Sequence, residues 1–204
     1  MANKKSPITR EPGQKHFVKS GVQYYKDDLN NWFCTYIKQE DLVGGGFEPE
    51  RNANEINETR LKRVREITGK QNPAVLDYGC GNGLMVRYFQ AQGVMGNGFD
   101  KFNPKFNRLE LGTGYDCVTL IEVVEHLTDP FPELKQIHDC LAPNGKVMIE
   151  TSFTDWLTPD DIYVEPSVGH CTIFSHIGLD HLMARFGFQP GVHINRNVRI
   201  YELG

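Results

Sequence analysis

Three glycines alternate with other residues in the stretch Asp77-Tyr78-Gly79-Cys80-Gly81-Asn82-Gly83. Glycine lets the main chain turn tightly and lets a ligand approach the backbone closely. The apolar run Ala74-Val75-Leu76 before the glycines predicts a buried parallel strand, and residues 84–92 after them predict a helix whose start offers free N–H groups. A strand, a glycine turn and a helix in this order predict a ligand-binding loop. Dinucleotide-binding loops need a further glycine where this chain has Leu84, so the loop matches a pyrophosphate poorly.

An acidic residue follows the next apolar segment, which ends in Gly98-Phe99-Asp100. This position places the Asp100 carboxylate at a strand end, one crossover away from the glycine loop. A carboxylate there can accept hydrogen bonds from both ribose hydroxyls of a nucleotide, as in doubly wound nucleotide-binding sheets. The alternative is a helix N-cap. Because the glycine loop lies nearby, we favour the ribose role.

The glycine block resembles the first motif of the class I S-adenosylmethionine-dependent methyltransferases, where the loop wraps the amino-acid end of the cofactor. Residues 115–127, Tyr-Asp-Cys-Val-Thr-Leu-Ile-Glu-Val-Val-Glu-His-Leu, resemble the fourth strand and following turn of the same superfamily. A helix from Asp129, the turn Ala142-Pro143-Asn144-Gly145 and a strand over 146–151 continue the resemblance. It implies S-adenosyl-L-methionine as cofactor and S-adenosyl-L-homocysteine as product.

The resemblance also implies which residues bind the cofactor. Gly79, Cys80 and Gly81 belong to the loop, and Asp77 orients it or meets the ammonium group of the cofactor. Ile121 and Glu122 line the cleft, with Glu122 as a hydrogen-bond acceptor. Arg60 interrupts an apolar stripe on the helix predicted over residues 52–68, and this cation either forms a structural ion pair or faces a ligand carboxylate. The sequence leaves these two roles of Arg60 open, and Arg60 joins the candidate cofactor residues.

Two histidines are candidates for polar contacts in the pocket. His170 lies in Val168-Gly169-His170-Cys171-Thr172-Ile173-Phe174-Ser175, which resembles a stretch of the subgroup with ubiquinone-type O-methyltransferases and sugar methyltransferases. An imidazole near neutral pKa suits proton removal from a substrate hydroxyl, so His170 is the candidate catalytic base. Its alternative is a loop anchor before a helix capped by Ser175. His126 either reaches the pocket or fixes its turn through the backbone, and we favour the second role.

The elements that position these residues predict an α/β fold. We expect a Rossmann-like, doubly wound, mostly parallel sheet with a C-terminal antiparallel hairpin over 191–202 and an N-terminal helical lid. Residues 1–22 predict a flexible arm, and residues 23–204 a single methyltransferase domain with its lid over 23–70 and its core over 71–204. Helical spacing predicts the first lid helix from Leu29, Trp32, Phe33, Tyr36 and Ile37.

The edge of the sheet beyond Asp100 is expected to be trimmed. Fifteen residues separate Asp100 from Asp116, where a helix and a third strand normally stand, so Arg108 to Leu111 predicts a short strand at most. The acidic residue that often holds the adenine amino group in relatives has no assignment here. The long segment 152–174 follows a strand end and is expected to select the substrate.

Composition excludes several classes of protein. The chain has 204 residues, a net charge of −4 and five scattered cysteines without a Cys-x-x-Cys pair, so we expect neither a metal site nor disulfides. No stretch is long and apolar enough for a membrane span or a signal peptide, which predicts a cytoplasmic protein. Acidic character argues against nucleic acid as a partner and leaves a small-molecule substrate; the oligomeric state is not predicted.

These observations predict an S-adenosylmethionine-dependent methyltransferase that acts on a metabolite, sugar or lipid head group by in-line methyl transfer. Two alternatives stay open. A nicotinamide-dependent oxidoreductase uses a similar sheet but needs the glycine that Leu84 replaces. A non-catalytic relative that binds a cofactor or a protein is compatible with the trimmed edge.

Overall fold

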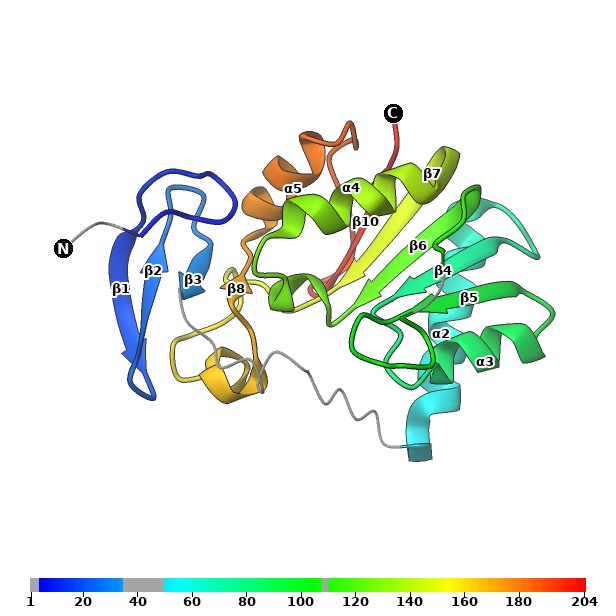
Figure 1. Ribbon diagram of the computed structural model, residues 1–204, viewed down its shortest axis with the longest axis horizontal. Coiled ribbons are helices and arrows are strands. Elements are labelled where there is room, and N and C mark those ends of the chain that lie inside the picture. Colours follow the sequence, from blue (N-terminus) through cyan, green and yellow to red (C-terminus); the bar gives the residue numbers. More distant parts are fainter. Residues whose placement is uncertain (1–3, 35–49, 108–109) are drawn as a thin grey trace.

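Two β-sheets organise the chain, and helices cover both faces of the larger one (Figure 1). This computed structural model describes residues 4–34, 50–107 and 110–204. The larger sheet has six strands in the order β5-β4-β6-β7-β10-β9. Strands β5, β4, β6 and β7 are parallel, while β10 pairs antiparallel with both β7 and β9. The strands are β4 (Ala74–Tyr78), β5 (Met95–Phe99), β6 (Tyr115–Ile121), β7 (Leu141–Glu150), β9 (Val192–Asn195) and β10 (Val198–Glu202).

Successive side chains along the strands point to opposite faces of this sheet, and both faces are buried under helices. Leu76 and Val118 pack with α4 (Pro130–Cys140) and α5 (His176–Ala184) in one apolar cluster. Their neighbours Val75 and Cys117 pack in a second cluster with α2 (Glu50–Thr68) and α3 (Leu84–Ala91). A buried strand with apolar residues on both faces is typical of a parallel sheet between two helical layers. The predicted doubly wound α/β fold and its C-terminal antiparallel hairpin are confirmed.

The larger sheet ends at β5, as the short connection after Asp100 predicts. The described residues 100–107 and 110–114 contain neither helix nor strand. The short strand allowed for Arg108 to Leu111 falls partly on residues 108–109, which lie outside the described residues. The turn predicted at 142–145 is absorbed into β7: Tyr115 pairs with Leu141, whereas Cys117 already pairs with Lys146. The extra residues bulge out of the ladder at that point.

The predictions for the N-terminal segment are wrong in two respects. Residues 1–22 were expected to be a flexible arm, yet β1 (Gln14–Lys19) and β2 (Val22–Lys26) form an antiparallel hairpin, and Ile8 is fully buried in the main apolar cluster. The first lid helix was expected around Trp32 and Phe33, which instead lie in β3 (Trp32–Cys34). Tyr36 and Ile37 lie outside the described residues. The predicted lid is helical only in α2.

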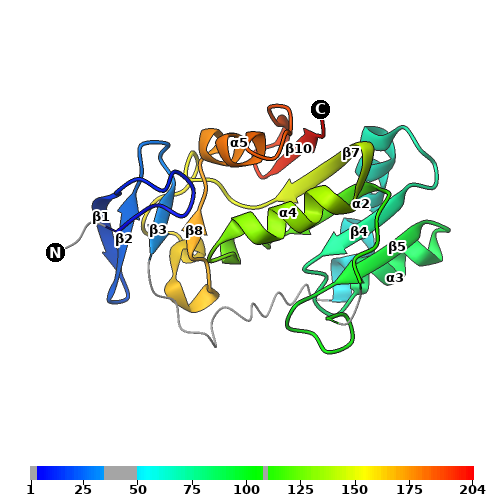
Figure 2. The same ribbon diagram turned by 45° about the horizontal axis from the view of Figure 1, so that its top comes forward.

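Long-range pairing explains this difference. β3 pairs with β2 and with β8 (Thr172–Ile173), which completes a four-stranded antiparallel sheet, β1-β2-β3-β8. Figures 1 and 2 show this smaller sheet beside the N-terminal end of α4. Short 3₁₀ helices complete the connections: η1 (Val124–His126), η2 (Ile162–Val164) and η3 (Pro166–Val168). The division into one domain over 23–204 stays a prediction.

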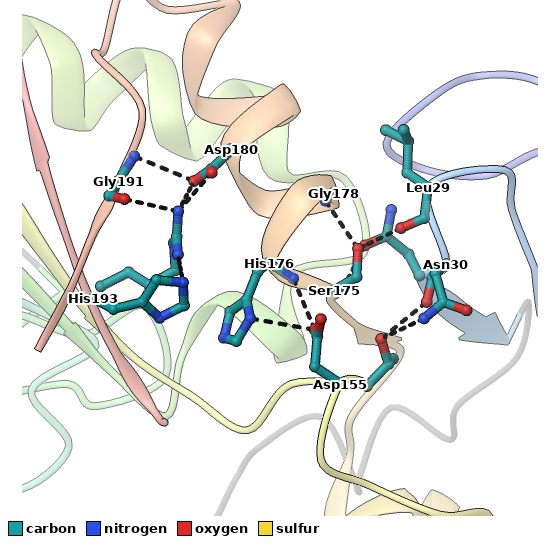
Figure 3. Close-up of polar contacts among 12 residues, drawn as sticks. Leu29, Asn30, Asp155, Ser175, His176, Gly178, Asp180, Gly191 and His193 are labelled. Atoms are coloured by element: carbon teal, nitrogen blue, oxygen red, sulfur yellow. Dashed lines mark hydrogen bonds and ion pairs between the residues drawn. The ribbon is translucent and has the colours of Figure 1, made fainter. Parts of the chain in front are cut away.

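Polar contacts at the start of α5 join the two sheets (Figure 3). The Ser175 hydroxyl accepts a hydrogen bond from the Gly178 amide at 2.9 Å and donates to the Leu29 carbonyl, which confirms the predicted cap. The buried Asn31 side chain accepts from the Ser175 amide at 2.8 Å. Asp155 accepts from the His176 amide at 3.0 Å. The loop before β3 is thereby fixed to the first turn of α5.

Gly178→Ala is expected to destabilise the protein. A Cβ atom added at Gly178 would lie 1.9 Å from Oδ1 of Asn31, so the buried amide would have to leave its contacts. Overpacking of this kind costs about 1 to 3 kcal/mol in the free energy of unfolding. Urea denaturation measures the change, with His181→Ala on the exposed side of the same helix as control. Equal stability of the two variants would contradict the contact.

Within the described ranges, no helix is both long enough and apolar enough to cross a membrane.

Candidate cofactor cleft and an adjoining acid-histidine cluster

The glycine loop connects β4 to α3 at the carboxyl end of the parallel strands. Gly79, Gly81 and Gly83 have φ angles of +82°, +54° and +75°, a region that favours glycine. The amides of Gly79 and Cys80 both donate to the Phe99 carbonyl, at 2.7 and 3.0 Å, which fixes the loop to the end of β5. A Cβ atom on Gly79 would lie 2.4 Å from the Val123 side chain. The first two sequence motifs therefore meet in space.

Asp100 lies directly beside this loop. Its Oδ2 accepts from the Gly81 amide at 2.8 Å, and its Oδ1 accepts from the amides of Phe102 and Asn103, both at 2.9 Å. These are contacts that cap a turn; the alternative role, a helix N-cap, is not met, because no helix follows in the described residues 101–107. A carboxylate has about four acceptor sites, so these three bonds leave one on Oδ2 for a ribose hydroxyl. The structure brings Asp100 to the loop as predicted, and its role toward ribose stays a prediction.

Two further loop residues are buried. The Asp77 carboxylate accepts a hydrogen bond from the Thr119 hydroxyl at 2.9 Å, and both residues are buried. This hydrogen bond joins β4 to β6 two residues before the first glycine of the loop, which is consistent with a role of Asp77 in orienting the loop. Burial raises the pKa of the Cys80 thiol to about 12, so this side chain stays protonated and acts as a small apolar group.

Arg60 forms the structural ion pair that was one of its two predicted roles. Its Nη2 lies 3.1 Å from Oε1 of Glu150 at the end of β7, and Arg60 is only 6% exposed. The two side chains line a cavity of about 470 Å³, together with Arg63 and residues 195–198 of the β9–β10 turn. This cavity contains no residue of the glycine loop. The structure thus does not bring Arg60 to the candidate cofactor residues at the loop.

Ile121 ends β6 and Glu122 follows it, so both lie at the carboxyl end of the strand next to β4. Glu122 has a φ of +52°, and its amide donates to the Glu150 carbonyl at 2.8 Å. A left-handed conformation at a glutamate is uncommon and turns the chain sharply toward η1. Much of Glu122 is exposed, but its carboxyl group lies beside the buried Glu125, and burial together with the charge of Glu125 raises the pKa of Glu122.

Glu125 is fully buried and lies at the centre of a polar cluster that the sequence did not reveal. The Tyr163 hydroxyl donates to its Oε1 at 2.5 Å, and Thr151 bonds the same hydroxyl at 2.8 Å. Burial and Glu125 raise the pKa of Tyr163, so the phenol keeps its proton. The one signal available was the Glu125 carboxylate directly after the apolar pair Val123-Val124, because a charge that becomes buried needs a partner. Tyr163 gave no such signal.

Both histidines anchor the loop before β8. His170 Nδ1 lies 2.7 Å from the Tyr163 carbonyl, and His126 Nδ1 lies 3.1 Å from the Gly169 carbonyl. The two rings are 4.6 Å apart. Burial lowers the pKa of His170 to about 4, which does not meet the expectation of an imidazole near neutral pKa. The contacts match the anchor role of His170 and the favoured structural role of His126.

Comparisons with known proteins agree with this geometry. A family model described as "Methyltransferase domain" matches residues 47–192. The ubiquinone biosynthesis O-methyltransferase of Vibrio atlanticus is 29% identical over 154 residues, covering 64% of this chain and 60% of the relative. That of Pseudomonas paraeruginosa is 26% identical over 121 residues, covering 48% and 52%. The chain thus spans about half to three fifths of the length of these curated relatives.

Solved structures share the fold. One is the 1,6-didemethyltoxoflavin-N1-methyltransferase of Burkholderia thailandensis, solved with 1,6-didemethyltoxoflavin and S-adenosylhomocysteine bound. Its TM-score is 0.61 at 16% identity, and the match covers 93% of this chain and 99% of that chain. DesVI of Streptomyces venezuelae has a TM-score of 0.58 at 14% identity, with 74% and 92% covered. At these identities the likeness concerns the fold alone. The match over residues 47–192 spans more than half of the sequence, and the chain therefore belongs to the methyltransferase domain family.

Proposed function

We propose that this protein is an S-adenosylmethionine-dependent methyltransferase that acts on a small molecule. One observation carries the proposal: the glycine loop, Asp100 and Glu122 follow three neighbouring parallel strands, β4, β5 and β6, at the same edge of the sheet. Ligands of open α/β sheets bind at the carboxyl ends of the strands. Membership of the methyltransferase domain family supports the same reaction.

The residues present fit the cofactor. A Cβ atom added at Gly81 would have no neighbour within 4 Å, so the space over the loop is open to a ligand. Asp100 retains acceptor capacity beside this space, and Glu122 follows the end of the adjoining strand β6. We assign Gly79, Gly81 and Asp100 to the cofactor, with Asp77 positioning the loop from below. Arg60 is left out of this set because of its pairing with Glu150.

The bound cofactor supplies an electrophilic sulfonium methyl group. The protein's task is then to hold a nucleophilic oxygen, nitrogen or carbon in line with that methyl and to exclude water. In this proposal the loop and Asp100 hold the cofactor, and we assign contact with the acceptor to segment 152–174, which follows β7. A metabolite, sugar or lipid head group fits this arrangement, and the curated relatives named for ubiquinone biosynthesis support an oxygen acceptor.

Binding of S-adenosylhomocysteine tests the proposal directly. Isothermal titration calorimetry should show one site for S-adenosylhomocysteine and none for NAD⁺ or NADH. Binding of a nicotinamide cofactor instead would favour the oxidoreductase alternative. If neither ligand binds at millimolar concentration, the proposed function is wrong.

Asp100→Ala is expected to weaken S-adenosylhomocysteine binding by about 1 to 3 kcal/mol, because the carboxylate that accepts a hydrogen bond from ribose is lost. Calorimetry on the folded variant measures the change. Asp139→Ala, on the exposed last turn of α4, is the matched control and should bind as the wild type does. Wild-type affinity in Asp100→Ala would remove Asp100 from the site.

A further inference from the structure

Three side chains that can bind a metal ion lie together beside the end of β6: those of Glu125, His126 and His170. One ligand atom from each of the three lies within 4.8 Å of the others. The cluster joins two segments that are far apart in the sequence, because the Cys171 amide donates to the Glu125 carbonyl at 3.0 Å. Glu125 is fully buried and His170 is 6% exposed, whereas His126 is half-buried and opens the cluster toward the surface.

Hydrogen bonding fixes which nitrogen of each histidine carries the proton. Nδ1 of His126 and Nδ1 of His170 each face a backbone carbonyl, of Gly169 and Tyr163 respectively. A carbonyl only accepts, so each Nδ1 is the protonated donor, and Nε2 of the neutral ring has a free lone pair. Metal-binding histidines are oriented in this way, with the second ring nitrogen bonded to a carbonyl or carboxylate. Both imidazoles are therefore prepared as ligands.

The Glu125 carboxylate supplies the third ligand and an independent sign of a missing partner. Its Oε1 accepts from the Tyr163 hydroxyl, whereas its Oε2 is buried and, among the described residues, has the carboxyl group of Glu122 beside the carboxylate rather than an N–H or hydroxyl donor. A buried acceptor without a partner is costly unless a proton or a cation satisfies it. The hydrogen bond from the Tyr163 hydroxyl would hold the ligating carboxylate in position.

We propose that Glu125, His126 and His170 bind a divalent transition-metal ion, with Zn²⁺ as the best-fitting example. Two imidazoles and one carboxylate suit Zn²⁺ better than Mg²⁺ or Ca²⁺, which prefer oxygen ligands. Ligand atoms around tetrahedral Zn²⁺ lie roughly 3.4 Å apart, so the three side chains would have to rotate inward by about 1 Å. The sequence predicted no metal site because the cysteines are scattered. That argument does not apply to this cluster, which contains no cysteine.

Three protein ligands leave a coordination position open, as in catalytic rather than structural zinc sites. We assign that position to the side of the half-buried His126, where Glu122 follows the end of β6. A substrate hydroxyl bound there would lose its proton to solvent more easily. Its oxygen would form the new bond to the methyl carbon while the carbon–sulfur bond breaks and S-adenosylhomocysteine leaves. This part of the inference rests on the proposed function; the metal site itself does not.

Metal titration of the full chain tests the site. Protein stripped with a chelator and then dialysed is titrated with Zn²⁺ by calorimetry and with Co²⁺ by visible absorption. We expect one equivalent to bind, with cobalt d–d bands, and Mg²⁺ to bind at least 10-fold more weakly. Glu125→Gln and His126→Ala should each lower Zn²⁺ affinity at least 10-fold, while His181→Ala, an exposed histidine on α5, should not.

Folding and the cofactor site are followed separately. Circular dichroism and S-adenosylhomocysteine binding report whether a variant is intact, and His126→Ala is the milder change if Glu125→Gln does not fold. If the wild type binds no more Zn²⁺ or Co²⁺ than His126→Ala does, the metal site is wrong, whatever the result for S-adenosylhomocysteine. If the wild type binds Zn²⁺ but not S-adenosylhomocysteine, only the proposed function is wrong.

The open coordination position has its own test. Acetohydroxamate, a small oxygen ligand of Zn²⁺ and Co²⁺, should shift the cobalt bands of the wild-type protein. An unchanged spectrum at saturating acetohydroxamate would show that no position is open to an acceptor oxygen and would overturn the role in acceptor binding.

Discussion

Gly79→Ala is expected to lower the free energy of unfolding by about 2 to 4 kcal/mol and to weaken S-adenosylhomocysteine binding at least 10-fold. Two effects add. The residue has a φ of +82°, where an alanine is strained, and the new Cβ would lie 2.4 Å from Cγ2 of Val123. Because Val123 belongs to the turn after β6, the substitution would separate the two loops that form the candidate cofactor cleft. Urea denaturation and calorimetry measure the two changes.

Gly81→Ala is the matched comparison within the same loop. Gly81 also has a positive φ, of +54°, but a Cβ atom there meets nothing within 4 Å. We expect a smaller loss of stability, and a loss of affinity because the methyl group enters the space assigned to the cofactor. In Gly79→Ala, the additional change Val123→Ala should restore part of the stability, since it removes the contacting methyl groups. Failure of this rescue, or equal stability of both glycine variants, would contradict the packing of Gly79 on Val123.

Asp180→Ala is expected to destabilise the protein by about 2 to 4 kcal/mol, because it leaves a buried guanidinium without its counter-charge. Arg199 on β10 is 2% exposed and pairs with Asp180 on α5, at 2.5 Å between Nη2 and Oδ2. The Tyr201 hydroxyl donates to the same carboxylate at 2.9 Å, and His193 contacts Arg199 from β9. Partial exposure of Asp180 keeps the expected cost below that of a fully buried pair.

The exposed pair Lys135–Asp139 on α4 provides the control for this prediction. Both side chains are more than half exposed, so Asp139→Ala should leave the urea midpoint unchanged within error. Asp180→Asn keeps a polar group of the same shape and should fall between the wild type and Asp180→Ala. Wild-type stability in Asp180→Ala would show that the network of Arg199 does not hold α5 on the sheet.

Local patterns in the sequence predict the elements of the core well. The apolar run at 74–76 with its glycines, the strand from Asp116 and the cap at Ser175 each lie in one continuous stretch, and the structure confirms all three as β4, β6 and the start of α5. The N-terminal segment is different, because its conformation depends on a distant partner. Trp32 and Phe33 pair with Ile173 and Thr172, and this pairing overrides the helical spacing of their neighbours.

The candidate site divides in the same way. The sequence by itself determined the methyltransferase fold and the edge of the sheet where Gly79, Asp100 and Glu122 meet, because each follows directly from a strand end. Only the tertiary structure decided that Arg60 pairs with Glu150 and that Glu125, His126 and His170 converge. Convergence requires the loop before β8 to close over the turn after β6, and neither segment carries a local pattern that encodes the other. Contacts between such segments arise from packing of the whole chain.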